Sequence, residues 1–202
     1  MYPLAMHRTH RRRRLTWWLV LFAVVVVVAM WGIWKLGRHS YEYFSSGGTY
    51  DAIIQSAAVR HGVDSRLIKA VIWQESRFRS DARGSKGEIG LMQIMPGSRH
   101  ALQDWADWNR VSLPNEGILS NPVLNIEVGT WYLSRALRRW NRYEGGVELA
   151  LCEYNAGYSK ARTWCPPSYD GQVIDRISYD GTRAYVVAIM GKYKEYKDTS
   201  TE

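Results

Sequence analysis

The chain has 202 residues, which is enough for one ordinary folded domain and a short additional segment. Its hydrophobic share of 46% and charged share of 23% are ordinary for a globular protein, so the composition excludes a chain that is disordered throughout. The net charge of +8 is concentrated in the first 38 positions, which hold seven basic residues and no acidic one, and the near-neutral remainder predicts no nucleic-acid partner.

The first element in chain order is a long apolar segment at residues 15–36, whose single charge is Lys35 near its end. About 20 apolar residues rising about 1.5 Å each cross a hydrocarbon core of about 30 Å. Tryptophans lie near both ends, where their rings favour the membrane interface. The segment therefore predicts a transmembrane anchor. The alternative, a cleaved signal peptide, usually has a shorter apolar core.

The segments on either side of this span have different compositions. Residues 1–14 form a basic tail, and the excess of arginine there predicts that the N-terminus stays in the cytoplasm. Residues 37–49 are polar and contain Gly and Ser, which indicates a linker. The domain that follows, residues 50–197, is then expected outside the cytoplasm.

The body of the chain is predicted to be mainly α-helical, because its apolar residues recur at helical spacing and few segments alternate with period two. Gly62 and Gly157 are expected to end helices, and Asp64 or Ser65 to begin one. Asn121 and Pro122 open a longer helix. Residues 101–120 give no clear pattern. The expected helices cover residues 50–61, 65 to about 78, 122–140, 145–156 and 182–197.

Two cysteines, Cys152 and Cys165, lie in this domain. A disulfide between them is possible in an oxidising compartment, and the alternative is that Cys152 is a small buried residue on a helix. The five histidines show no metal-ligand spacing, and no glycine-rich phosphate loop is present. We therefore expect neither a metal nor another cofactor.

A glutamate extends the apolar stripe of the second predicted helix. Leu67, Ile68, Val71 and Ile72 form the stripe, and Glu75 follows Val71 by four positions and Ile72 by three, so it shares their face. A carboxyl group drawn partly out of water has a raised pKa and keeps its proton. This is the state that a general acid needs near neutral pH.

A structural role for Glu75 is the alternative to a catalytic one. A glutamate at a helix end often forms a salt bridge, here with Arg77 or Arg79 two or four positions later. Periodicity by itself favours this ordinary explanation, because most glutamates in such positions are structural.

Four sequence blocks change this balance. They are Gln74–Phe78 (QESRF), Gly90–Pro96 (GLMQIMP), Asn125–Leu133 (NIEVGTWYL) and Glu153–Gly157 (EYNAG). In this order and spacing they closely resemble the catalytic domain of the soluble lytic transglycosylase (SLT) family, and the similarity covers about residues 50–192.

The resemblance implies a helical, goose-type-lysozyme-like fold with a groove for peptidoglycan glycan strands. It places the family's catalytic glutamate at Glu75, which would protonate the glycosidic oxygen and then accept the proton of the muramoyl 6-hydroxyl. The product would carry a 1,6-anhydromuramic acid end. With the predicted anchor, the domain would lie on the periplasmic side of a bacterial inner membrane.

The resemblance also assigns further side chains. A hydroxyl from Tyr154 would orient the catalytic carboxyl, and Asn155 would either bind an N-acetyl group or cap its helix. Tyr185, in the family's final helix, is expected to pack and take no part in the chemistry. Gly84 and Asp175 depart from the family pattern, which has Ser at the first position in many relatives and can have Glu at the second. The expected substrate-binding residues are Gln93, Met95, Tyr132, Tyr154, Asn155 and Asp175.

Two other functions stay open at this point. A lysozyme-type muramidase would hydrolyse the same bond with water, and Asp81 or Glu88 would then have to serve as a base opposite Glu75. A non-catalytic peptidoglycan-binding module is the second alternative, but binding alone would not require Glu75 and Tyr154.

Overall fold

The computed structural model describes residues 22, 24–34, 48–96 and 101–199. The chain divides into two compact units, Met1–Phe44 and Ser45–Glu202. In the first unit residues 24–34 are helical. Among the residues described, no helix combines the length and the apolar character that a membrane crossing requires.

Several of the predicted N-terminal boundaries fall outside the described residues. This group comprises the basic tail at 1–14, both ends of the predicted span at 15–36, and the linker up to residue 47. The last two linker residues, Gly48 and Thr49, are described and begin a short 3₁₀ helix.

The second unit is built from helices, which confirms the prediction of a mainly helical domain. In its described part, extended pairing is limited to isolated bridges from Ile89 to Arg83 and Ile94. The helices are α2 (Asp51–His61), α3 (Ser65–Ser76), α4 (Ala101–Asn109), α5 (Pro122–Trp140), α6 (Gly146–Ala156), α7 (Tyr158–Trp164) and α8 (Asp180–Asp198), with 3₁₀ helices η1 (Gly48–Tyr50), η2 (Glu116–Ser120) and η3 (Ile174–Arg176).

Local side-chain chemistry accounts for the helix boundaries that were predicted correctly. Asp64 caps α3, since its carboxylate accepts the Arg66 backbone N–H at 2.9 Å. Asn121 caps α5 in the same way, with Pro122 in the first turn. Gly62 ends α2 in the left-handed conformation, at a φ of 65°.

Other boundaries differ from the prediction. Helix α3 ends at Ser76 and not near Phe78, because Arg77 and Phe78 both have left-handed φ values, 53° and 60°. Helix α8 begins at Asp180, two residues earlier than expected. The segment 101–120, which gave no pattern, forms α4 and η2, and α7 was not predicted.

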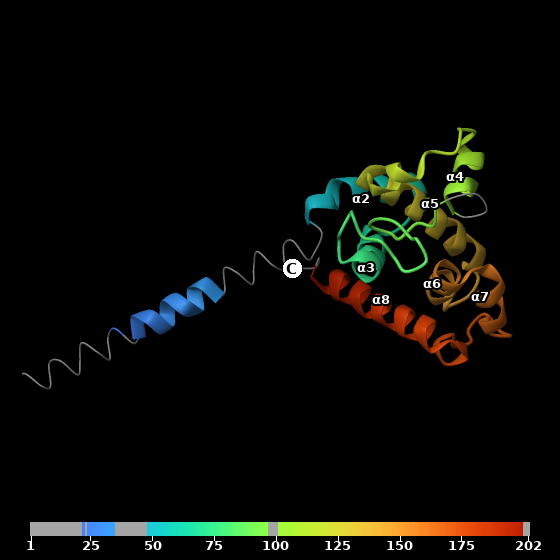
Figure 1. Ribbon diagram of the computed structural model, residues 1–202. Coiled ribbons are helices and arrows are strands. Elements are labelled where there is room, and N and C mark those ends of the chain that lie inside the picture. Colours follow the sequence, from blue (N-terminus) through green and yellow to red (C-terminus); the bar gives the residue numbers. More distant parts are fainter. Residues whose placement is uncertain (1–21, 23, 35–47, 97–100, 200–202) are drawn as a thin grey trace, which may run out of the picture. The chain divides into compact units, whose positions relative to one another are not determined.

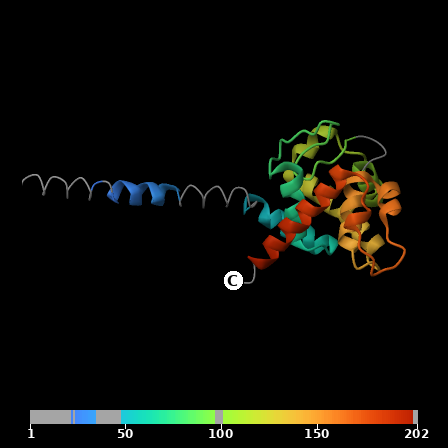
Figure 2. The same cartoon turned by 90° about the horizontal axis from the view of Figure 1, so that it is seen from below.

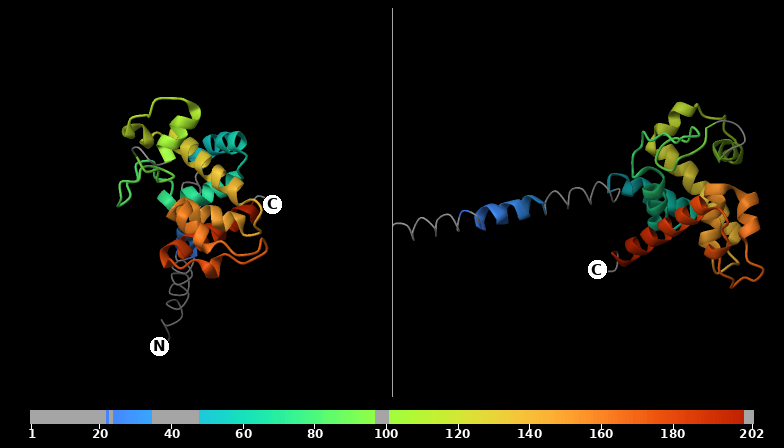
Figure 3. Two further views of the ribbon diagram at one scale, coloured as in Figure 1. Left: turned by 90° about the vertical axis from the view of Figure 1, so that its right-hand side faces the viewer. Right: turned by 60° about the horizontal axis from the view of Figure 1, so that its bottom comes forward.

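Helix α3 lies at the centre of the domain (Figure 1). It packs against α2 and α8, while α5 packs against α2, α4 and α6. Ile68 and Ile72 of α3 are completely buried. Helix α8 runs along one side of the domain (Figure 2), and α6 and α7 lie beside each other (Figure 3). The final helix therefore covers the helix that carries Glu75.

A buried asparagine on α5 holds the loop between α3 and α4. The carboxamide of Asn125 accepts the Met92 backbone N–H at 2.7 Å and donates to the Ile89 and Leu119 carbonyls at 2.8 and 2.9 Å. Buried backbone groups need such partners, since an unmade bond there costs about 1–3 kcal/mol. Asn125 thus fixes the loop against the core.

The two cysteines are both free thiols. Cys152 is completely buried on α6, and its removal from water raises the pKa of its thiol to about 12, with Glu148 adding to the effect. The expectation of a small buried residue is confirmed for Cys152, and no disulfide joins it to Cys165.

Candidate active site

Glu75 lies in the last turn of α3, at the end of the apolar stripe. Val71 and Ile72 are completely buried, whereas Glu75 is partly exposed and lines a cavity. The helix ends one residue later, so the carboxyl group lies at the boundary between the core and solvent. This placement agrees with the helical spacing in the sequence.

Tyr185 of α8 donates a hydrogen bond from its hydroxyl to Oε1 of Glu75 at 2.6 Å. The two residues are 110 positions apart in the chain, and Tyr185 is itself buried. Tyr185 was expected to pack, and it does lie in the core, but its hydrogen bond to Glu75 was not predicted. The packing of α8 against α3 brings this hydroxyl to the carboxyl group.

The pKa of Glu75 is raised from 4.5 to about 7. Burial is the largest cause, because it disfavours the charged carboxylate. The Tyr185 hydrogen bond acts in the opposite direction, and the negative charge of Glu88 raises the pKa further. Near neutral pH the group can therefore both give and take a proton.

Glu75 forms a salt bridge with neither Arg77 nor Arg79, the two partners considered from the sequence. The Arg77 guanidinium stacks on the Trp73 ring, 3.4 Å from its centroid, and donates to the Trp73 carbonyl. Arg79 donates to the Ser76 carbonyl at 3.3 Å. Glu75 is thus left with a neutral hydroxyl partner, which suits a group that has to change its protonation state.

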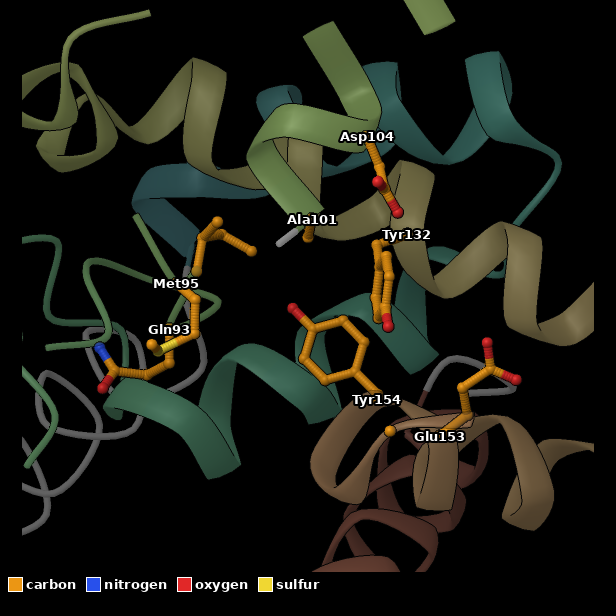
Figure 4. A pocket seen from close by; sticks show the side chains of 9 residues that line it. Gln93, Met95, Ala101, Asp104, Tyr132, Glu153 and Tyr154 are labelled. Atoms are coloured by element: carbon orange, nitrogen blue, oxygen red, sulfur yellow. The ribbon is translucent and has the colours of Figure 1, made fainter. Parts of the chain in front are cut away.

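Three cavities follow one another across the domain and share lining residues. We call them the central, α4–α5 and α8 cavities. The central cavity is lined by Glu75, Gly84, Ser85, Glu88, Gln93, Met95, Tyr154 and Asn155. The α4–α5 cavity (Figure 4) is lined by Gln93, Ile94, Met95, Ala101, Asp104, Tyr132, Glu153, Tyr154 and Gly157. The α8 cavity is lined by Gln74, Asn155, Tyr179, Gly181, Thr182, Ala184, Tyr185 and Ala188.

The structure brings most of the predicted site residues together. The central cavity collects Glu75 with four of the predicted substrate-binding residues, and Tyr132 lines the adjoining α4–α5 cavity. Asp175 differs, because it is exposed on η3 and lines none of these three cavities. The four residues that share the cavity with Glu75 are Gln93, Met95, Tyr154 and Asn155.

Tyr154 anchors the loop between α3 and α4 through the hydroxyl that was expected to orient the Glu75 carboxyl. It donates to the Met92 carbonyl at 2.9 Å. Its ring meets the Tyr132 ring edge to face, with centroids 5.7 Å apart, and both rings line the α4–α5 cavity opposite Gln93 (Figure 4). The two tyrosines therefore form one wall of that cavity.

The side-chain carboxamides of Gln93 and Asn155 each form hydrogen bonds within the protein, Gln93 through its nitrogen and Asn155 through its oxygen. Gln93 has a left-handed φ of 48°, and its Nε2 donates to the Gly90 carbonyl at 2.9 Å. Asn155 accepts a hydrogen bond from the Thr182 hydroxyl at 2.8 Å, which joins α6 to α8. Both side chains are thus positioned before any ligand arrives.

Sequence reasoning missed the role of three residues near the site. Tyr185 and Asn125 act through contacts between distant segments, which periodicity does not reveal. Glu153, next to Tyr154, is buried and holds its carboxylate against the Arg139 guanidinium and the Trp140 indole N–H. The one available signal for Glu153 was a charged residue directly after the apolar run Leu149–Cys152 of α6.

Comparison with known proteins gives a consistent result. The family model described as "Transglycosylase SLT domain" matches residues 52–174. An "X polypeptide" from Escherichia coli is 32% identical over 103 residues, which are 49% of this chain and 55% of that protein. "Membrane-bound lytic murein transglycosylase F" from Desulfosudis oleivorans is 33% identical over 113 residues, 54% of this chain and 22% of that protein.

A solved structure shares the fold. It is the X-ray structure of an inactive variant of lytic transglycosylase Slt from Pseudomonas aeruginosa, in which a glutamate is replaced by glutamine. It is 30% identical, has a TM-score of 0.67, and covers 77% of this chain and 25% of that one. The chain thus spans about half or less of the length of these relatives.

Proposed function

Since the chain belongs to the family of transglycosylase SLT domains, we propose that it is a peptidoglycan lytic transglycosylase. Its substrate would be the β-1,4 bond between N-acetylmuramic acid and N-acetylglucosamine. The relatives that are named lytic transglycosylases support this choice.

The reaction needs one carboxyl group that works twice. Glu75 gives its proton to the glycosidic oxygen as the bond to the muramoyl anomeric carbon breaks, and N-acetylglucosamine leaves with a free 4-hydroxyl. The muramoyl 6-hydroxyl then attacks the anomeric carbon, and its proton passes to the Glu75 carboxylate. The 1,6-anhydro ring closes, no water is consumed, and Glu75 regains its starting state. The intramolecular nucleophile removes the need for a second carboxylate.

The observation that carries this proposal is the environment of Glu75. Its carboxyl group faces the central cavity and accepts a hydrogen bond from the Tyr185 hydroxyl at 2.6 Å. Burial raises its pKa to about 7, so the group keeps its proton up to about that pH. Gln93, Met95, Tyr132, Tyr154 and Asn155 would bind the sugars on either side. Asp175 would contact the strand only if it extends as far as η3.

The test is mass spectrometry of the fragments that the full-length chain releases from purified peptidoglycan. Fragments with 1,6-anhydromuramic acid ends, absent with the Glu75→Gln variant, are the expected result. If the wild-type chain bound peptidoglycan and released nothing, the protein would be a binding module and the proposal would be wrong.

A muramidase is the second candidate, and the position of Glu88 favours it over other hydrolytic schemes. Glu88 lines the central cavity with Glu75, and its charge acts on the Glu75 pKa, whereas Asp81 is exposed and lines none of the three cavities. Glu88 would then activate a water molecule. Reducing muramic acid ends among the released fragments, lost in Glu88→Gln, would establish this reaction in place of the first.

We further propose that residues 15–36 anchor the chain in the bacterial inner membrane, with residues 1–14 in the cytoplasm. Residues 37–49 would be the linker and residues 50–197 the catalytic domain on the periplasmic side. The apolar run, the arginines that precede it and the relative named as membrane-bound support this arrangement.

A further inference from the structure

One face of α4 continues past the residues that line the α4–α5 cavity. Ala101 and Asp104 line the cavity, and Trp108 follows them at positions i+7 and i+4. Residues at this spacing share one face of a helix. Trp108 therefore extends the cavity wall along α4.

Trp108 is unusually exposed for its size. Its side chain is 71% exposed, while its neighbour Trp131 on α5 is 3% exposed. The two ring centroids are 6.4 Å apart, and the planes are tilted by 52°. Trp108 thus leans against the buried ring of Trp131 and leaves most of its own surface to solvent, although tryptophan is among the residues that gain most from burial.

Two charged side chains flank these rings. The Arg135 guanidinium lies 4.9 Å from the Trp131 ring centroid, and its Nη1 is 3.6 Å from the Asp104 carboxylate. That separation is long for a charge-assisted hydrogen bond, and both side chains are more than a third exposed. Asp104 and Arg135 can therefore still accept and donate hydrogen bonds to a ligand.

This combination of groups suits a sugar ring. The C–H face of a pyranose is apolar and stacks on an indole, while its hydroxyl groups need acceptors and donors at the edge. Asp104 of α4 provides an acceptor and Arg135 of α5 provides a planar donor, and the two groups lie next to each other beside the tryptophan rings. The position, next to the cavity that Tyr132 and Tyr154 line, is where a strand leaving the central cavity would continue.

We propose that Asp104, Trp108 and Arg135 form a distal sugar subsite, which holds the glycan strand beyond the α4–α5 cavity and makes the protein prefer long strands. This inference rests on the proposed function, because it assumes that a glycan strand occupies the cavities around Glu75. It assigns a length preference to residues that lie away from the reacting bond.

The test compares Trp108→Ala with the wild-type full-length chain on purified glycan strands of two lengths, the shortest that wild type cleaves and strands several disaccharides longer. Loss of the stacking platform should lower kcat/KM on long strands by about tenfold and leave the shortest strands unchanged. Trp108→Phe, which keeps an aromatic ring, should restore most of the loss. Tyr169→Ala, at an exposed aromatic that lines none of the three cavities, is the matched control.

The outcomes separate this inference from the proposed function. An equal loss on both lengths, or none, in Trp108→Ala would overturn the distal subsite while Glu75→Gln still abolished cleavage. Cleavage that persisted in Glu75→Gln would instead defeat the proposed function. A length-dependent loss in Tyr169→Ala as well would also count against the subsite, because it would show that the effect is not specific to Trp108.

Discussion

At the scale of single residues, the burial that raises the pKa of Glu75, on which the proposed reaction depends, also lowers the stability of the folded chain. The unfolded chain holds this carboxyl group at its ordinary pKa of 4.5, and the folded chain at about 7. Below pH 4.5 the group is protonated in both states and costs nothing. As pH rises to about 7 the unfolded state ionises first, so the folded state loses stability, and above pH 7 the full penalty of at most about 3 kcal/mol is present.

Replacing this carboxyl with a neutral amide of the same shape should therefore stabilise the protein. We expect Glu75→Gln to raise the free energy of unfolding at pH 8 by up to about 3 kcal/mol and to leave it unchanged at pH 4. Urea denaturation at the two pH values measures this. Glu144→Gln, at an exposed position, should show no such difference. An equal effect of Glu75→Gln at both pH values would contradict the burial argument.

Tyr185 should influence the rate through Glu75. Its hydroxyl favours the ionised carboxylate, so Tyr185→Phe should raise the Glu75 pKa further and move the alkaline loss of activity to a pH above about 7. Loss of one positioning hydrogen bond should also slow cleavage by about tenfold. A pH–rate profile checks both effects.

The matched control for this change lies on the same helix. Tyr193 also donates its hydroxyl to a carboxylate, Asp64, at 2.9 Å, but away from the cavities. Tyr193→Phe should leave the pH–rate profile in place. A profile that moved equally in both variants would point to a general effect on α8 and not to a contact with Glu75.

At the scale of helices and loops, the approach of Met92 to α5 decides where the loop between α3 and α4 lies. A Cβ on Gly129 would lie 2.5 Å from Met92 Sδ and 2.8 Å from its Cβ, so this position requires glycine. Met92 also donates its N–H to Asn125 and accepts the Tyr154 hydroxyl. The loop, α5 and α6 are therefore joined through one residue.

Gly129→Ala should displace this loop. We expect a loss of stability of about 1–3 kcal/mol from overpacking, together with a fall in cleavage rate as Gln93 and Met95 move. Gly191→Ala is the control, because nothing lies within 4 Å of its added Cβ on α8, and it should be neutral or stabilise by up to about 1 kcal/mol. Thermal denaturation and cleavage assays on both variants provide the measurement. Normal activity in Gly129→Ala would show that the loop tolerates the shift.

The helices that could be predicted are those whose signals are local. Each of these helix ends is marked by a capping residue directly beside it, namely Asp64, Asn121, Gly62 or Gly157. Helix α4 and α7 escaped prediction because they are short and their burial depends on packing against α5 and α6.

The candidate site could be predicted in part. Glu75 follows from helical spacing together with the family resemblance, and the GLMQIMP and EYNAG blocks supplied half of the residues that line the central cavity. The hydrogen bonds of Tyr154 to Met92 and of Tyr185 to Glu75 could not be predicted, because they join segments that are far apart in the sequence. Asp175 was assigned by resemblance, and nothing in its own neighbourhood in the sequence indicated that η3 would leave it exposed.

At the scale of the whole molecule, the apolar N-terminal segment should hold the chain at the membrane. We expect the full-length chain to stay with the membrane fraction after an alkaline carbonate wash, and a variant lacking residues 2–36 to appear in the soluble fraction. The Glu75→Gln chain, which keeps the segment, should behave as wild type. Equal membrane retention of the shortened variant would contradict the anchor.

The hydrogen bond between Glu75 and Tyr185 also has a consequence for biosynthesis. Residue 75 leaves the ribosome long before residue 185, and α8 is the last helix of the described domain to be made. A nascent or prematurely terminated chain that ends before α8 carries the Glu75 carboxyl without its hydroxyl partner and without the helix that shields it from water. Such a fragment cannot hold the raised pKa of Glu75, so under the proposed function it gains cleavage activity only after α8 has been made and has packed against α3.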